Sequence, residues 1–396
     1  MKMKYDFTTV LDRTNTGSIK WNMMKEKKAD VSKGVIPYSV ADMEFKNPPE
    51  IIEGLKTYLD TYILGYQTAE PAFYQAVNGW TSRRYHWETK PEWLYTTPGV
   101  VNAFYNGVRA FSKKGEGVIV MTPVYYPFYG AIKKSGREIV KCPLLAVDGH
   151  YEMDFKRFEK LAKKSSNTLL LFCNPHNPTG RVWTREELKK LGDICLKYGI
   201  FIISDEIHCD IIMPGHEFTS FATVSKELEH HMMTCIAPSK TFNLAGLETA
   251  CVIMENSKQF EKLKVKMGQN AQEGRVNALG YRACEIAYMQ CDEWLDELIQ
   301  VIYENHLVLK DFMEEHCPRV VVGELEGTYL QWMDFRSYKW SRNEQERIMT
   351  EEAELFFDEG SLFGPEGDGF ERMNLACPKS VMMEGLLRLE KVLTAE

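Results

Sequence analysis

The chain has 396 residues, 44% of them hydrophobic and 26% charged, so its length suggests two domains with enough residues for a large core. Its net charge of −8 at pH 7 argues against a nucleic-acid-binding protein and against attraction to anionic membranes. No hydrophobic run approaches the roughly 20 residues of a membrane-spanning helix. The N-terminal residues also lack the hydrophobic core of a signal peptide.

The ten cysteines are scattered, without a C-x-x-C motif or a paired histidine spacing. Disulfides and a structural zinc site are therefore not expected. Apart from His176 and His208, the histidines lie in polar, loop-like or helix-surface contexts and are expected to be solvated or structural. His306, in a predicted helix, is one of them. We predict a reduced, cytoplasmic protein with no metal site, no nucleic-acid partner and no membrane association.

Residues 1–45 are predicted to form an N-terminal arm and part of a small domain. In residues 46–285, helical patterns alternate with short hydrophobic stretches at 117–123, 168–175, 200–206, 232–238 and 249–255. Strands without a polar face are typical of a mostly parallel sheet that helices cover on both sides. The alternation predicts a large, doubly wound α/β domain.

A capping-box spacing, Thr184 followed by Glu187, predicts the start of a helix over residues 184–199. Residues 286–396 are predicted to form a smaller α+β domain. Its expected elements are a long helix over 291–316, strands at 326–335 and 369–376, a helix over 343–360 and a C-terminal helix. No linker rich in serine or glycine separates the two domains, which favours close packing and a ligand site between them.

Four polar residues directly follow hydrophobic runs of the α/β part: Tyr125, Asn177, Asp205 and Lys240. In an open parallel sheet, the carboxyl ends of the strands form the crevice in which ligands bind. Each residue alone has a structural explanation, such as a turn, a loop cap, a core tyrosine or a lysine that reaches solvent. Their occurrence together, one strand end after another, predicts a functional site.

A cofactor with an aldehyde and a pyridine ring fits these residue types. A lysine amine condenses with an aldehyde to give a Schiff base, so Lys240 is the predicted attachment point. A carboxylate such as Asp205 keeps a pyridine nitrogen protonated, which lets the ring take up electrons. An amide such as Asn177 can hold the ring hydroxyl, and an aromatic side chain can stack on the ring. The phosphate needs donors at a helix start, which Gly99, Val100, Val101 and the hydroxyl of Ser239 can supply.

The motifs NPHNPTG, SDEIHCD, APSKTFNLAGL and GFERMNLA follow one another along the chain. In these motifs the chain resembles the pyridoxal-phosphate (PLP) enzymes of fold type I, the aspartate aminotransferase superfamily, over nearly its full length. The segments RTNTGSIKW, VADMEF, LGYQ, PVYYPF and SLFGPEGDGFERMN are most similar to its carbon–sulfur lyase branch, the MalY/PatB or cystathionine β-lyase type.

The resemblance implies a role for each matching residue. Lys240 would bind PLP covalently and later carry the substrate's α-proton. The resemblance also implies a set of cofactor-binding residues: Asp205 at the pyridinium nitrogen, Asn177 and His208 at the ring oxygen, Tyr125 and Ile207 on the two ring faces, and Gly99, Val100, Val101 and Ser239 at the phosphate.

The substrate and the second subunit are implied in the same way. Arg372 would bind the α-carboxylate of an amino-acid substrate, because a bidentate arginine–carboxylate pair fixes orientation as well as charge. Asp42, in VADMEF, is a second predicted substrate-binding residue. Tyr66 would reach the phosphate of the neighbouring subunit, which implies a homodimer with shared active sites.

One position departs from the aminotransferase pattern. Eight residues after Lys240, where typical aminotransferases of this fold have a phosphate-binding arginine, this chain has Glu248. A carboxylate beside a phosphate would be repelled or forced to bind a proton, so we expect Glu248 to point away from the cofactor. The departure weakens the aminotransferase interpretation more than the fold assignment.

The resemblance therefore implies β-elimination at the Cβ–S bond of cystathionine, cysteine or an S-conjugate, giving a thiol, pyruvate and ammonia. An aminotransferase of class I or II, which transfers an amino group to a 2-oxo acid, is the first alternative because it shares the early steps. A regulatory protein that holds PLP and acts by binding a partner is an alternative of another class.

Overall fold

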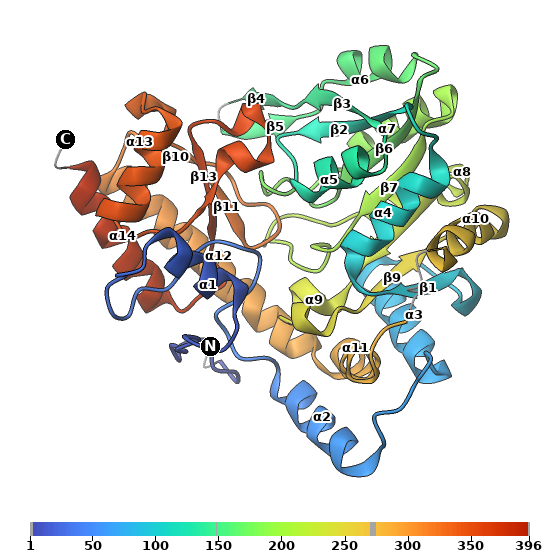
Figure 1. Cartoon of the computed structure of the whole chain (residues 1–396), viewed down its shortest axis with the longest axis horizontal. Helices are drawn as coiled ribbons and strands as arrows, with labels where there is room; N and C mark the ends of the chain where they lie inside the picture. Colours follow the sequence, from blue (N-terminus) through green and yellow to red (C-terminus); the bar gives the residue numbers. More distant parts are fainter. Residues whose placement is uncertain (1–2, 148, 270–274, 395–396) are drawn as a thin grey trace.

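The chain folds around two large β-sheets, and a long helix, α12 (Asp292–His316), runs from the region of the first sheet to that of the second (Figure 1). The structure is a computed structural model that describes residues 3–147, 149–269 and 275–394. The N-terminal arm lies against the smaller part, and α2 (Pro49–Thr61) packs against α11 (Ala278–Gln290) at the lower edge of the view (Figure 1).

The larger sheet has seven strands in the order β1–β9–β8–β7–β6–β2–β3. All neighbours from β8 to β3 pair in parallel, whereas β9 is antiparallel to both β8 and β1. The prediction of a mostly parallel sheet in an α/β fold is therefore confirmed. The strands are β1 (Leu94–Thr97), β2 (Gly117–Thr122), β3 (Glu138–Pro143), β6 (Asn167–Cys173), β7 (Phe201–Asp205), β8 (Met232–Ile236) and β9 (Ala250–Ile253).

Helices cover both faces of this sheet, and a separate cluster of buried hydrophobic side chains lies on each face. The predicted capping box is present, because Glu187 N donates to Thr184 Oγ1 at 3.2 Å and Thr184 N donates to Glu187 Oε2 at 2.9 Å. One face carries α4 (Gly99–Phe111), α5 (Pro127–Lys134) and α10 (Ser257–Gly268). The other carries α3 (Pro71–Tyr85), α6 (Phe155–Ala162), α7 (Arg185–Tyr198), α8 (Lys226–His230) and α11 (Ala278–Gln290).

The smaller sheet is antiparallel, with its strands in the order β10–β11–β13–β12. Its strands are β10 (Val321–Val322), β11 (Leu330–Asp334), β12 (Asp358–Glu359) and β13 (Phe370–Asn374). The helices of this part are α1 (Ile19–Lys27), α12, α13 (Arg342–Arg347) and α14 (Lys379–Leu393). The chain also contains the hairpin of β4 (Leu145–Val147) and β5 (His150–Glu152), the short helix α9 (Pro238–Thr241) and several short 3-10 turns.

Two expectations for this part differ from the structure. The helix expected over 343–360 ends early: α13 stops at Arg347, one π-helical turn follows to Glu352, and Asp358–Glu359 join the sheet. Three consecutive side chains at 355–357 are buried, which a helix with one buried face cannot achieve, so tertiary packing overrides the local helix propensity. The domain boundary predicted at residue 285 falls inside α11, and we propose that the division lies at Cys291, where α11 gives way to α12.

A buried ion pair fixes the loop after β6 to the smaller part of the molecule. Arg181 Nη1 lies 2.5 Å from Glu326 Oε2, and the same oxygen accepts a hydrogen bond of 2.8 Å from Val182 N. Both charged side chains are less than 10% exposed. Arg181 also pairs with Glu187 at 2.8 Å, so this buried network joins the start of α7 and the loop after β6 to Glu326, which precedes β11 in the smaller part.

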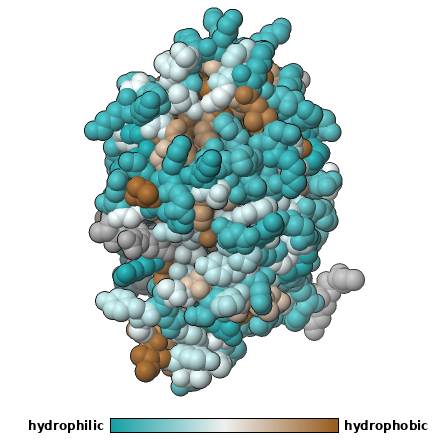
Figure 2. Space-filling view, turned by 90° about the vertical axis from the view of Figure 1, so that its right-hand side faces the viewer, coloured by the Kyte–Doolittle hydropathy of each residue, from teal (hydrophilic) through white to brown (hydrophobic). Residues whose placement is uncertain are grey.

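All ten cysteines are free and buried, and burial raises the pKa of every thiol. Among the residues that the structure describes, no helix combines the length and the apolar character needed to cross a membrane. Figure 2 shows a face of the molecule that is mainly hydrophilic, with scattered hydrophobic side chains.

Candidate active site

The predicted site residues start from aligned strand ends. Asp205 is the last residue of β7, and its Cα partners in the sheet are Cys173, at the end of β6, and Cys235, near the end of β8. Asn177 follows β6 by four residues, and Lys240 follows β8 by four residues on α9. The parallel register therefore brings an amide, a carboxylate and an amine to the same edge of the sheet.

A cavity of about 260 Å³ lies at this edge. Every predicted site residue except Asp42 and Tyr66 lines it. The predicted residues that do line the cavity are Gly99, Val100, Val101, Tyr125, Asn177, Asp205, Ile207, His208, Ser239, Lys240 and Arg372.

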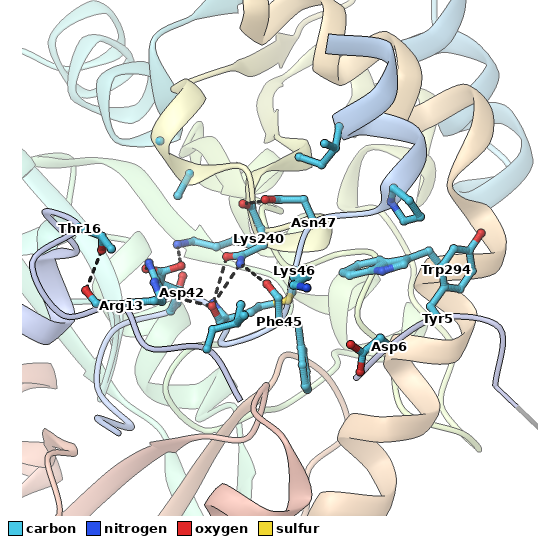
Figure 3. Close-up of a pocket in the computed structure, with 18 of the residues that line it drawn as sticks. Tyr5, Asp6, Arg13, Thr16, Asp42, Phe45, Lys46, Asn47, Lys240 and Trp294 are labelled. Atoms are coloured by element: carbon cyan, nitrogen blue, oxygen red, sulfur yellow. Dashed lines mark hydrogen bonds and ion pairs between the residues drawn. The ribbon is translucent and has the colours of Figure 1, made fainter. Parts of the chain in front are cut away.

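Lys240 reaches across the cavity to the N-terminal arm. Its Nζ donates a hydrogen bond of 2.6 Å to the carbonyl oxygen of Ala41, and Figure 3 shows it beside Asp42. Burial lowers the pKa of Lys240 to about 8, because the attraction of Asp42 and Asp205 only partly offsets desolvation and the nearby Arg372. A lysine with this pKa has a substantial neutral fraction near pH 7.5, so it can serve as a nucleophile and as a base.

Asp205 is buried, and its Oδ1 accepts a hydrogen bond of 3.2 Å from the backbone N–H of Ile207. Burial raises the pKa of this carboxyl to about 7, against the lowering effects of that hydrogen bond and of Lys240. An acid at this depth is stabilised in its charged form by a cationic partner. A protonated ring nitrogen would be such a partner.

Arg372 on β13 lies opposite the sheet edge and contacts it directly. Its Nη1 donates to Asn177 Oδ1 at 2.8 Å, its Nη2 pairs with Asp358, and its guanidinium carbon lies 4.7 Å from the centre of the Phe363 ring. Because Asn177 Oδ1 accepts from the arginine, the amide nitrogen of Asn177 remains as a donor for a ligand. The Nε of Arg372 is buried without a hydrogen-bond partner.

Two further residues complete the inner walls. Tyr125 N donates to the carbonyl oxygen of Asn177 at 3.0 Å, and burial raises the pKa of the Tyr125 hydroxyl. His208 is buried, its Nδ1 has no hydrogen-bond partner, and desolvation together with Lys240 and Arg372 lowers its pKa well below the usual value. His208 is therefore neutral, with one ring nitrogen available to a ligand.

The start of α4 forms the remaining wall. Gly99 has a φ of +79°, and a Cβ built on it would meet no atom within 4 Å, so open space lies over its backbone. The first N–H groups of a helix have no partners within the helix and attract anions. A helix start with open space above it, an unpartnered His208 Nδ1, a buried carboxyl and a lysine of lowered pKa together fit the predicted PLP cofactor.

A wider cavity of about 1040 Å³ adjoins the inner one, and Lys240 lines both. Asp42 lies in the wall of the wider cavity, beside Lys240, and not in the inner cavity (Figure 3). Its Oδ2 is 2.8 Å from Arg13 Nη2. Glu248, expected to point away from the cofactor, lines both cavities. It therefore lies closer to the site than we expected from the repulsion between a carboxylate and a phosphate.

Tyr66 is not brought to this site within one subunit. It is fully exposed and lines a different cavity, where the guanidinium carbon of Arg275 lies 6.0 Å from the centre of its ring. The residues before it, Tyr62, Ile63 and Leu64, are also more than 60% exposed.

The inner wall also contains nine residues that were not predicted as site residues: Val40, Ala41, Pro98, Phe104, Tyr126, Cys173, Ala245, Glu248 and Thr249. Val40 and Ala41 lie in the arm, and nothing in their side chains marks them as site residues, because Ala41 contributes through its backbone carbonyl. Tyr126 stands beside Tyr125, so a polar aromatic next to a predicted site residue was a usable signal.

Comparisons with known proteins agree with this geometry. The family model for aminotransferases of class I and II matches residues 33–389. Cystathionine β-lyase PatB from Bacillus subtilis is 39% identical over 97% of this chain and 98% of its own length. The structure of cystalysin from Treponema denticola, which contains a PLP cofactor, is 48% identical, covers 99% of this chain and 100% of its own, and has a TM-score of 0.97. A PLP-bound C–S lyase from Staphylococcus hominis is 30% identical, with coverages of 99% and 98% and a TM-score of 0.91.

Proposed function

Because the chain belongs to the aminotransferase class I and II family of PLP enzymes, we infer from its carbon–sulfur lyase relatives that it is a PLP-dependent carbon–sulfur lyase. It breaks the Cβ–S bond of an amino acid and yields a thiol, pyruvate and ammonia. The observation that carries this function is the single cavity that holds Lys240, Asp205, Asn177 and Arg372 at the carboxyl edge of the sheet.

We propose that these residues hold the cofactor as follows. Lys240 binds the aldehyde carbon, Asp205 the ring nitrogen, and the amide nitrogen of Asn177 the ring oxygen, with His208 beside it. The other proposed contacts are Tyr125 and Ile207 on the ring faces, and Gly99, Val100, Val101 and Ser239 at the phosphate. When bound, PLP draws into its ring the electrons released at the substrate's α-carbon.

The remaining steps belong to the protein's own side chains. Arg372 binds the α-carboxylate and fixes the orientation of the substrate. Once the substrate's amino group has replaced it at the aldehyde carbon, Lys240 would be a free amine, and its lowered pKa of about 8 would let it remove the proton from the α-carbon. The electron pair of the Cβ–S bond then leaves with sulfur as a thiolate, and the three-carbon remainder takes up water and departs as pyruvate and ammonia. Asp205 keeps its negative charge next to the ring nitrogen throughout.

The decisive experiment gives the purified holoenzyme L-cystathionine or L-cysteine without any 2-oxo acid. We expect pyruvate together with a thiol from cystathionine or sulfide from cysteine. Turnover that needs 2-oxoglutarate and releases neither thiol nor sulfide would instead establish the runner-up, an aminotransferase, which the family model keeps open. Cystathionine, cysteine and S-conjugates such as S-methyl-cysteine, compared by kcat/KM, would rank the substrates.

We also propose a homodimer in which Tyr66 serves the phosphate site of the partner subunit. Two observations support this: Tyr66 is fully exposed, and it lies outside the inner cavity of its own subunit. Lys240→Ala and Tyr66→Ala, each inactive or weak, are mixed under conditions that allow subunit exchange. In a mixed dimer one site then has both defects and the other has neither, so activity should rise well above that of either parent.

If Tyr66 acts within its own subunit, each site of the mixed dimer carries one defect and the mixture stays as weak as its parents. Light scattering on the unmodified protein checks the dimer itself. We further propose a reduced, cytoplasmic location, which the ten free and buried cysteines support.

A further inference from the structure

The wall between the two cavities contains a residue in a rare backbone conformation. Val40 has a φ of +58° and lines the inner cavity, as does Ala41, whose carbonyl oxygen accepts the hydrogen bond from Lys240 Nζ. The left-handed region is unfavourable for a β-branched residue, because its side chain crowds the backbone. A residue stays there only where the surroundings hold it, and such residues cluster at functional sites.

Two side chains of the smaller sheet hold this segment. Asp358 Oδ2 accepts a hydrogen bond of 2.7 Å from Val40 N. Asn374 Nδ2 donates to the carbonyl oxygens of Val40, at 2.8 Å, and of Asp42, at 2.9 Å. The backbone of the arm is thereby fixed to β12 and β13.

The oxygen of Asp358 that binds Val40 also binds Arg372. Arg372 Nη2 pairs with Asp358 Oδ2, and the two side chains are 3% and 6% exposed. Arg372 and Val40 line the inner cavity, and Asp358 does not, so the carboxylate approaches both from behind the wall. One buried oxygen atom thus sets the position of a guanidinium and of a backbone amide that border the same cavity.

We propose that Asp358 is a positioning residue for the substrate's α-carboxylate site, a proposal that rests on the role of Arg372 in the proposed function. A bidentate arginine–carboxylate pair requires the two groups to be nearly coplanar, so a guanidinium held at Nη1 by Asn177 and at Nη2 by Asp358 offers its remaining donors in one orientation. The role is geometric, and a neutral acceptor of the same shape should fulfil it.

The test measures binding of two matched ligands to the holoenzyme by the absorbance of the bound cofactor. L-alanine carries the α-carboxylate and no leaving group, and L-alanine methyl ester lacks the charge. We expect Asp358→Ala to raise the Kd of L-alanine by about tenfold or more, since a guanidinium that is no longer oriented would lose about one of its charge-assisted hydrogen bonds to the α-carboxylate. The Kd of the ester should change by less than about threefold.

Asp358→Asn keeps an oxygen acceptor for Arg372 and for Val40, so its Kd values for both ligands should stay within about threefold of those of the unmodified protein. Hydrogen–deuterium exchange of the peptide containing Val40, measured without cofactor, should accelerate in Asp358→Ala and not in Asp358→Asn. If Asp358→Ala does not fold, Asp358→Ser takes its place. Serine keeps a polar atom, but its side chain is too short to reach both Arg372 and Val40, so the Kd of L-alanine should again rise.

Glu359→Gln is the matched control. Glu359 is the other residue of β12, and its carboxylate pairs with Lys27, which is 30% exposed. This variant should alter neither Kd nor exchange at Val40. The proposal is overturned if Asp358→Ala weakens the acid and the ester equally, which indicates general damage, or if both Asp358 variants tighten L-alanine, which indicates that Asp358 only damps the charge of Arg372.

Arg372→Ala separates this proposal from the proposed function. If Arg372→Ala still prefers the acid to the ester as strongly as the unmodified protein, the assignment of Arg372 fails whatever Asp358 does. If Arg372→Ala loses the preference and Asp358→Ala keeps it, only the role of Asp358 fails.

Discussion

The two walls of the inner cavity are built in different ways. On the sheet side, Asn177, Asp205 and Lys240 each follow a strand, and the pairing of β6, β7 and β8 is sufficient to align them. On the opposite side, Val40 and Arg372 meet only through Asp358, and the hydrogen bond from Val40 to Asp358 joins residues 318 apart in the chain.

The difference suggests a division of labour. The sheet wall carries the amine and the carboxyl whose pKa values are shifted by burial, to about 8 and about 7, so it holds the groups that move or stabilise protons and charge. The opposite wall carries a fixed guanidinium and backbone groups that orient a ligand. Changes in the sheet wall should therefore act mainly on kcat, and changes in the opposite wall mainly on KM.

The largest effect is expected from Lys240→Ala. Removal of the amine removes both the cofactor attachment and the base, so kcat should fall by roughly 10³-fold or more. Borohydride treatment should label the peptide containing Lys240 in the unmodified protein and nowhere in the variant. Lys113→Ala, at an exposed lysine, should retain both activity and labelling, and labelling at another lysine in the unmodified protein would refute the assignment.

The next effect concerns the stability of the cofactor-free protein. Burial raises the pKa of the native Asp205 carboxyl to about 7, so it keeps its proton up to about that pH, whereas the unfolded one loses it near its ordinary pKa of 3.8. Between these pKa values the unfolded state binds fewer protons, so the free energy of unfolding falls as pH rises. From about pH 5 to about pH 7.5 the unmodified protein should lose up to about 3 kcal/mol relative to Asp205→Asn.

Denaturant titrations of both proteins at the two pH values measure this difference. Asp193→Asn removes an exposed carboxylate on α7 that pairs with Lys189 and should reproduce the pH dependence of the unmodified protein. Equal pH dependence in Asp205→Asn and in the unmodified protein would mean that Asp205 does not titrate in this range, and the contrast between the walls would lose its electrostatic basis.

A smaller effect is expected from Arg372→Lys. Lysine keeps the charge but cannot make the bidentate pair, so KM should rise by about 30-fold while kcat changes by a few-fold at most. Steady-state kinetics with the substrate that has the highest kcat/KM measure both quantities. Arg342→Lys, at an exposed arginine paired with Asp368, should change neither. A fall in kcat as large as the rise in KM would contradict the proposed division of labour.

The smallest effect is expected from Asp42→Asn. Asp42 and Arg13 are each 24% exposed, and ion pairs that solvent reaches contribute little. We expect KM to change by about threefold or less, with the change confined to substrates whose sulfur substituent reaches the wider cavity. Asp311→Asn, at an exposed helical position, is the control. A loss of activity similar to that of Lys240→Ala would move Asp42 from the rim of the site to its chemistry.

The same contrast explains what could be predicted from the sequence. The sheet wall was predictable because a hydrophobic run followed by a polar residue reveals both the strand and its end. Asp358 was not, because its partner Val40 lies 318 residues away in the chain and its local sequence indicates a helix. His306 was expected in a polar or surface context, yet it is buried on α12 and bonded to Gln331 at 2.7 Å, since only packing against β11 decides which helix face is covered.

The protein's own thiols have a consequence for an enzyme that releases sulfur nucleophiles. Thiol–disulfide exchange requires a thiolate that can reach its target, and all ten cysteines here are buried and have raised pKa values. Cys173 borders the inner cavity, where its raised pKa keeps it a thiol rather than a thiolate. The cysteines therefore form mixed disulfides with oxidised product only slowly. The enzyme can work in the thiol-rich environment that its own turnover creates without being chemically modified by it.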